Sequence, residues 1–213
     1  MNRRLWVKFC GLRQAEDVNR AVALGVDAVG FVFATRSRRY IEPAAARLLR
    51  DRLPSSVSAV ALFMDDSRDW IREVISVVAP DLLQFHGNES PASCDAFGMR
   101  HLKAIAMGSV DNAAEFMSEY PAAEGFLLDS HALGDQGGSG ERFDWRRFPR
   151  TSRRPLILAG GLTPENVGVA VRQTRPWGVD VSSGIESAPG LKDAQRMRRF
   201  IDEARRADES QND

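Results

Sequence analysis

Cysteine and histidine are scarce in this chain, with two and three residues among 213. Cys10 and Cys94 lie far apart and form no C-x-x-C pair, so we expect free thiols rather than a disulfide. The histidines, His86, His101 and His131, show none of the spacings that are typical of metal ligands. The composition therefore argues against a disulfide scaffold and against a metal site.

An excess of charge of either sign is also missing, because 29 Lys and Arg residues balance 29 Asp and Glu residues. Neutralising a phosphate backbone needs a basic excess, so we expect no nucleic-acid partner. No apolar run approaches the roughly 20 residues that span a bilayer, and the amino-terminal residues lack the pattern of a signal peptide. We therefore predict a cytoplasmic protein with no membrane partner.

The chain does contain a regular alternation of short apolar runs and longer segments of helical period, which is typical of repeated βα units. Strands are predicted at residues 5–9, 28–33, 57–63, 81–85, 101–106, 125–128, 156–159 and 178–181. Helices are predicted at residues 14–24, 43–52, 67–78, 90–97, 111–119, 144–148, 164–173 and 192–204.

Eight strands, each followed by a helix, predict an α/β fold of the (β/α)8 TIM-barrel type. The loops must be compact, since 213 residues is short beside the roughly 250 typical of this fold. A doubly wound open sheet is the alternative, but no G-x-G-x-x-G motif follows the first strand. We predict one catalytic barrel domain over residues 1–205 and a frayed polar tail over residues 206–213.

Glycine-rich turns follow the last two predicted strands, where this fold commonly binds phosphate. Gly160 and Gly161 allow a ligand to approach the backbone closely, and Ser183 and Gly184 offer a hydroxyl and N–H groups. The alternative is that these glycines only form tight turns. The pattern predicts a small phosphorylated molecule as the partner.

Side-chain alternation directs Cys10 and Asp129, at the ends of the first and sixth strands, toward the mouth of the barrel. A thiol and a carboxylate on opposite walls of a cleft suit proton transfer, one as base and one as acid. The alternative for Cys10 is that it only packs in the core, as buried cysteines often do. For Cys94, on a predicted helix, we expect this packing role.

Other inward-facing side chains complete the predicted pocket. Gln84 and His86 share a face of the fourth strand and are expected to line the pocket, although either could equally satisfy buried polar groups. Lys8 and Asp180 face inward on the first and eighth strands, which become neighbours when the barrel closes. We predict that these two form a buried ion pair beneath the active site and hold the strand that carries Cys10.

A series of short motifs runs in order along nearly the whole chain. It consists of KFCGL at 8–12, GVDAVGFVF at 25–33, SRRY at 37–40, QFHG at 84–87, LLD at 127–129, GGSG at 137–140, FDW at 143–145, GGLTPENV at 160–167, DVSSGIE at 180–186, PG at 189–190 and KD at 192–193. Together these motifs resemble the phosphoribosylanthranilate isomerase family of tryptophan biosynthesis. Phe9 and Phe85 depart from the smaller aliphatic residues usual in that family, which bears on packing rather than on chemistry.

The resemblance implies an Amadori rearrangement of N-(5-phosphoribosyl)anthranilate to 1-(2-carboxyphenylamino)-1-deoxyribulose 5-phosphate, without a metal or another cofactor. It implies that Asp129 protonates the ring oxygen as general acid and that Cys10 removes the C2′ proton as general base. Arg39 is similar to the family's contact for the anthranilate carboxylate, a task that suits a bidentate guanidinium. Arg36 and Arg38 are interpreted as solvated, and the assembly is left open as a monomer or a homodimer.

Three other functions were weighed against this one. A metal-dependent sugar-phosphate epimerase needs His and Asp ligands at several strand ends, and the second strand supplies none. A barrel isomerase acting on a histidine-pathway intermediate would use aspartates as both acid and base, which Cys10 disfavours. A catalytically silent phosphosugar-binding module would lack the acid or the base, whereas this sequence has a candidate for each.

Overall fold

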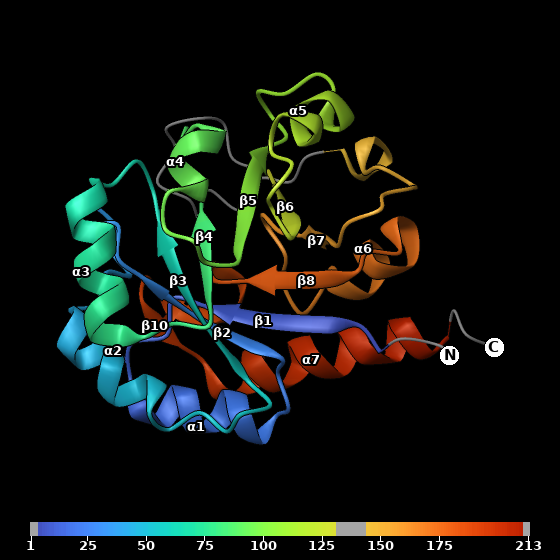
Figure 1. Ribbon diagram of the computed structural model, residues 1–213. Helices are drawn as coiled ribbons and strands as arrows, with labels where there is room; N and C mark the ends of the chain where they lie inside the picture. Colours follow the sequence, from blue (N-terminus) through green and yellow to red (C-terminus); the bar gives the residue numbers. More distant parts are fainter. Residues whose placement is uncertain (1–3, 131–143, 211–213) are drawn as a thin grey trace.

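Eight parallel strands close into a barrel in the order in which they occur along the chain (Figure 1). The strands are β1 (Trp6–Cys10), β2 (Ala28–Val32), β3 (Ser58–Phe63), β4 (Leu82–Phe85), β5 (His101–Ala106), β6 (Gly125–Asp129), β7 (Leu156–Leu158) and β8 (Gly178–Val181). The computed structural model describes residues 4–130 and 144–210. The predicted (β/α)8 barrel is confirmed, and every strand boundary lies within one residue of its predicted position.

Helices surround the barrel on the outside (Figure 1). They are α1 (Ala15–Ala23), α2 (Pro43–Arg50), α3 (Arg68–Val78), α4 (Pro91–Asp95), α5 (Ala113–Glu119), α6 (Val167–Thr174) and α7 (Ala194–Glu209), with short 3₁₀ turns η1 (Trp145–Arg147) and η2 (Ser183–Ile185). The helix expected at residues 144–148 is thus a single 3₁₀ turn, which the Asp144 side chain caps by accepting from the Arg146 N–H. Among the described residues, no helix is long and apolar enough to cross a membrane.

The two unusual phenylalanines pack between the strands and the outer helices. Phe9 on β1 meets Phe200 of α7 edge to face, with ring centroids 6.1 Å apart. Phe85 on β4 lies between Phe63 of β3 and Phe97, at centroid distances of 6.3 and 6.1 Å. Both residues are therefore on the outward faces of their strands, away from the interior of the barrel, which is consistent with an effect on packing alone.

The last helix extends beyond the predicted domain boundary at residue 205. α7 continues to Glu209, Ala207 is buried in the core, and the Asp208 carboxylate accepts a hydrogen bond from the Leu5 N–H at 2.8 Å. These contacts hold the final turn against the barrel. Residues 206–209 therefore belong to the helix rather than to the polar tail expected there.

A short hairpin follows β8 and was not predicted from the sequence. Its strands are β9 (Glu186–Ala188) and β10 (Leu191–Lys192), and Gly190 between them has a φ of +81°. A backbone in this left-handed region favours glycine, which accounts for the PG step at the turn. The hairpin brings Glu186 opposite Lys192 and places both close to the end of β8.

Candidate active site

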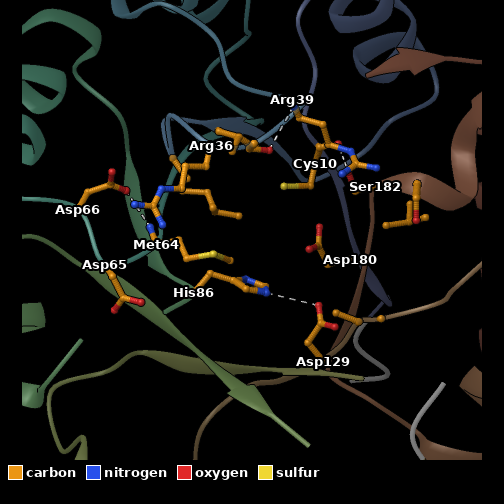
Figure 2. Close-up of a pocket in the computed structure, with 18 of the residues that line it drawn as sticks. Cys10, Arg36, Arg39, Met64, Asp65, Asp66, His86, Asp129, Asp180 and Ser182 are labelled. Carbon is orange, nitrogen blue, oxygen red and sulfur yellow. Dashed lines mark hydrogen bonds and ion pairs between the residues drawn. The ribbon is translucent and has the colours of Figure 1, made fainter. Parts of the chain in front are cut away.

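A pocket of about 600 Å³ opens among the carboxyl ends of the strands (Figure 2). Its lining comes from the ends of every strand except β5 and from the loops that follow them. The pocket brings together most of the predicted site residues, namely Cys10, Arg39, His86, Asp129, Gly160, Gly161, Asp180 and Ser183. Two predicted residues, Gln84 and Gly184, lie outside this lining.

The candidate acid and base approach the cavity from different strands that are not neighbours in the barrel. Figure 2 shows the Cys10 thiol and the Asp129 carboxyl group both directed into the cavity. Both residues are largely buried, with 4% and 7% of their surface exposed. Because the cavity lies between them, a bound substrate can meet a proton acceptor on one side and a proton donor on the other.

The predicted Lys8–Asp180 ion pair is confirmed. Lys8 Nζ donates to Asp180 Oδ1 at 2.9 Å, and the register of β1 with β8 sets the two residues side by side. Burial alone would lower the pKa of Lys8, but the charge of Asp180, assisted by Cys10, outweighs it and the net pKa is raised. Lys8 thus remains protonated two residues before Cys10 on the same strand.

The thiol environment is set by burial and by these charges. Burial raises the pKa of Cys10, and the negative charge of Asp180 raises it further. The positive charges of Lys8 and Lys192 lower this pKa, but the net result is still a raised value. The reactive thiolate therefore becomes more populated as the pH increases above neutrality. Cys94 behaves as expected for a packing residue, since it is fully buried and burial raises its pKa to about 12.

Gly30 on β2 provides the space into which Cys10 and Lys8 extend. A Cβ atom at this position would lie 2.8 Å from Cys10 Sγ and 3.2 Å from Lys8 Nζ. Gly30→Ala is therefore expected to destabilise the protein by about 1–3 kcal/mol through overpacking and to lower kcat by displacing the thiol. Urea unfolding and steady-state turnover measure the two effects, and a Gly30→Ala variant with wild-type values of both would contradict this role.

Gln84 and His86 differ in depth although they share a face of β4. His86 lines the pocket, with Nε2 3.6 Å from Asp129 Oδ2. Gln84 is fully buried one layer below, with its Nε2 3.1 Å from His86 Nδ1. Gln84 therefore supports the imidazole that stands beside the candidate acid, instead of lining the pocket as predicted.

The turns after β7 and β8 fit together through glycine. Gly160, with a φ of +75°, approaches Ser130 so closely that a Cβ atom would lie 2.3 Å from the Ser130 backbone nitrogen. A Cβ atom on Gly184 would lie 1.8 Å from the carbonyl oxygen of Leu162. Gly184 thus joins the two turns, while Gly160, Gly161 and Ser183 line the cavity where an anion can meet N–H groups and a hydroxyl.

Arg39 lines the pocket, but its guanidinium already has a partner. Nε and Nη2 donate to the two carboxylate oxygens of Glu186 at 2.8 Å each, and these hydrogen bonds raise the pKa of Arg39. A substrate carboxylate would have to use Nη1 or displace Glu186. Arg36, interpreted from the sequence as solvated, is exposed but also lines the pocket.

Several pocket residues were not assigned a role from the sequence. They are Val32, Ala34, Thr35, Arg36, Ser37, Leu62, Met64, Asp65, Asp66, Ser67, Ala159, Leu162, Val181 and Ser182. Their position at or just after the carboxyl ends of strands is the signal that could have identified them. His131, the GGSG motif at 137–140 and residue 143 lie outside the described residues. Within residues 4–130 and 144–210, no group of three or more His, Cys, Asp or Glu side chains is arranged to hold a metal ion.

A closed (β/α)8 barrel with candidate proton-transfer groups and glycine-rich turns around one cavity at the strand ends defines the class of the protein: a (β/α)8-barrel enzyme. The family model described as N-(5'-phosphoribosyl)anthranilate (PRA) isomerase matches residues 7–203. The chain belongs to this family.

Individual relatives agree with the family match. The N-(5'-phosphoribosyl)anthranilate isomerase of Stenotrophomonas maltophilia (strain K279a) is 55% identical over 207 residues, which cover 96% of this chain and 95% of the relative. The crystal structure of phosphoribosyl anthranilate isomerase from Thermotoga maritima is 37% identical, with a TM-score of 0.83 and coverage of 94% and 98%. Another solved isomerase, in complex with reduced 1-(o-carboxyphenylamino)-1-deoxyribulose 5-phosphate, is 36% identical, with a TM-score of 0.77 and the same coverage.

Proposed function

We propose that this protein isomerises N-(5-phosphoribosyl)anthranilate to 1-(2-carboxyphenylamino)-1-deoxyribulose 5-phosphate, as a step of tryptophan biosynthesis, with Asp129 as general acid and Cys10 as general base. The observation that carries this assignment is that both groups face one cavity from strands β6 and β1. Membership of the family supports the reaction, and the position of the two side chains in the cavity supports the choice of residues.

In the first step the Asp129 carboxyl group gives its proton to the ring oxygen of the ribose. The bond between C1′ and that oxygen breaks, and the lone pair of the anthranilate nitrogen forms a protonated Schiff base with C1′. His86, at 3.6 Å from the carboxylate that remains, can stabilise its negative charge when the imidazole is protonated. The ring is thereby opened without hydrolysis.

In the second step the Cys10 thiolate removes the proton from C2′. The electrons of that C–H bond form a double bond between C1′ and C2′ and neutralise the Schiff base. The resulting enol loses its hydroxyl proton and C1′ gains one, which gives the ketone. The thiolate of Cys10, whose pKa is raised by burial, grows with pH, whereas Asp129 must keep its proton to act as the acid. We therefore expect a bell-shaped dependence of kcat/KM on pH.

Different parts of the cavity lining are assigned to the two anionic groups of the substrate. The phosphate is proposed to bind backbone N–H groups of the turns at Gly160, Gly161, Ser183 and Gly184, of which the first three line the cavity. The anthranilate carboxylate is proposed to meet Arg39 from the loop after β2. The enzyme is proposed to act in the cytoplasm, as a monomer or a homodimer, on this small phosphorylated substrate and without a cofactor, nucleic acid or membrane.

The direct test is an isomerase assay on purified protein, followed by the loss of fluorescence of the anthranilate adduct. We expect turnover with no added metal and the same turnover after treatment with a chelator. The matched sample is the same protein with the Cys10 thiol alkylated, which we expect to be inactive. A folded wild-type protein that leaves the substrate unchanged would refute the proposed function.

A further inference from the structure

Lysine is used in an unusual way in this chain. Only three of its 29 basic residues are lysines, Lys8, Lys103 and Lys192, and the other 26 are arginines. All three lysine side chains are buried, with 0%, 1% and 0% exposed, and each forms an ion pair with a carboxylate. An ammonium group is more compact than a guanidinium, so lysine suits a narrow buried position. The proposed mechanism gives no role to Lys192.

Lys192 lies on β10 behind the ends of β1 and β8. Its Nζ donates to Glu186 Oε1 at 2.8 Å, to the Ser182 carbonyl oxygen at 3.0 Å and to Ser182 Oγ at 3.4 Å. Ser182 Oγ in turn donates to the carbonyl oxygen of Cys10 at 3.1 Å. The ammonium group is thus connected through one side chain to the backbone of the candidate base.

The same carboxylate that pairs with Lys192 also holds Arg39. Glu186 accepts two hydrogen bonds from the Arg39 guanidinium, and its side chain is only 4% exposed. Although burial opposes it, the bonds from Arg39 and Lys192 lower the pKa of Glu186, so the carboxylate stays ionised between two cations. One buried cluster, Arg39–Glu186–Lys192, therefore links the loop after β2 to the hairpin.

The charged groups that face Cys10 come from four parts of the barrel. Lys8 lies on β1 itself, Asp180 on β8, Lys192 on β10 and Arg39 on the loop after β2, and each interacts electrostatically with the thiol. Lys192 also faces Asp17 of α1 and Glu186. Lys8 and Asp180 carry opposite charges, whereas the Arg39–Glu186–Lys192 cluster has two cations for one carboxylate. The cluster therefore carries one net positive charge near the thiol, to which the ammonium group of Lys192 contributes.

We propose that Lys192 is a positioning residue for the base: its buried ammonium group holds Ser182 against the Cys10 strand end and stabilises the negative charge of the Cys10 thiolate. This inference rests on the proposed role of Cys10. Burial of the thiol without a net positive charge nearby would leave the thiolate scarce at neutral pH. The hairpin that follows β8 thereby becomes part of the catalytic apparatus, although it does not line the pocket.

The test measures the thiolate directly and requires no turnover. Cys10 is alkylated with iodoacetamide over a range of pH values, and mass spectrometry of the Cys10 peptide gives the rate at each pH. Lys192→Gln retains an N–H donor for Ser182 and Glu186 but removes the charge. We expect the midpoint of its alkylation profile to lie at higher pH than that of wild type, with a several-fold slower rate at neutral pH.

Lys192→Met, of similar length, removes both the charge and the donor, and the midpoint is expected to shift in the same direction. Glu186 remains paired with Arg39 in both variants, so no unpaired carboxylate is left. Arg13→Gln is the matched control, because Arg13 is an exposed cation beside Gly190 of the same hairpin. The alkylation profile of this variant should coincide with that of wild type.

An unchanged midpoint in either folded Lys192 variant would overturn the proposal. Faster alkylation at every pH with an unchanged midpoint would also overturn the proposal, because it would show only that the end of β1 had become more accessible. Because alkylation is independent of isomerisation, a failed isomerase assay would refute the proposed function while leaving the role of Lys192 at the thiol to be decided by the profiles.

Discussion

Replacing Cys10 with alanine is expected to lower kcat by about 10²- to 10⁴-fold, the usual contribution of a positioned general base. The thiol faces the cavity, so its removal leaves no sealed void and the barrel should remain folded. Asp129→Asn is expected to have an effect of similar size, because an amide of nearly the same shape has no acidic proton to give to the ring oxygen. Steady-state turnover and thermal unfolding of each variant measure the two properties separately.

The second cysteine provides the control for this prediction. Cys94 is a fully buried residue of α4, outside the pocket, and its pKa of about 12 keeps it as a thiol. Cys94→Ala should therefore retain the wild-type kcat and lose only some stability. A fully active Cys10→Ala variant would rule out Cys10 as the base, and a fully active Asp129→Asn variant would rule out Asp129 as the acid.

Period-two alternation was sufficient to predict which residues face each other inside the barrel. Lys8 and Asp180 are 172 positions apart in sequence, yet the closure of β1 on β8 and the alternation along each strand place them in contact. The same reasoning directed Cys10 and Asp129 to the mouth. The predicted strand ends are accurate because each apolar run is buried on both faces and ends where polar residues begin.

Alternation gives the face of a strand but not the depth of a residue within the barrel. Gln84 and His86 share a face of β4, but only His86, one layer nearer the carboxyl end, reaches the cavity. The depth depends on how far each strand is staggered against its neighbours, and this stagger is a property of the closed barrel. The sequence of β4 therefore could not separate a pocket residue from the residue that supports it.

The pairing of Arg39 could not be predicted either. Its partner Glu186 is 147 residues away and lies on a hairpin strand of three residues. A strand of that length has no periodic signal, so neither the hairpin nor the burial of Lys192 is visible in the sequence. The motif indicated Arg39, which lines the pocket, whereas only the fold shows the Glu186 carboxylate that is already bound to its guanidinium.

Removing the cation of the confirmed buried pair is expected to have the largest effect on stability. Lys8→Ala leaves the Asp180 carboxylate, whose side chain is 9% exposed, without its partner at 2.9 Å. An uncompensated buried charge of this kind typically destabilises a protein by about 3–5 kcal/mol. The free energy of unfolding from urea titration at neutral pH, compared with that of wild type, gives the measurement.

The double variant Lys8→Met with Asp180→Asn separates the lost ion pair from the unpaired charge. Because it removes both charges, its free energy of unfolding should lie well above that of Lys8→Ala.

The pH dependence of stability gives a second check on the ion pair. The pKa of Lys8 is raised in the folded state, so its stabilising contribution is fully present below the ordinary lysine pKa of 10.5 and is lost as the pH rises through the folded value. The stability gap between wild type and Lys8→Ala should therefore narrow only in strongly alkaline solution. A gap that is already absent at neutral pH would show that the pair contributes nothing to the closure of β1 on β8.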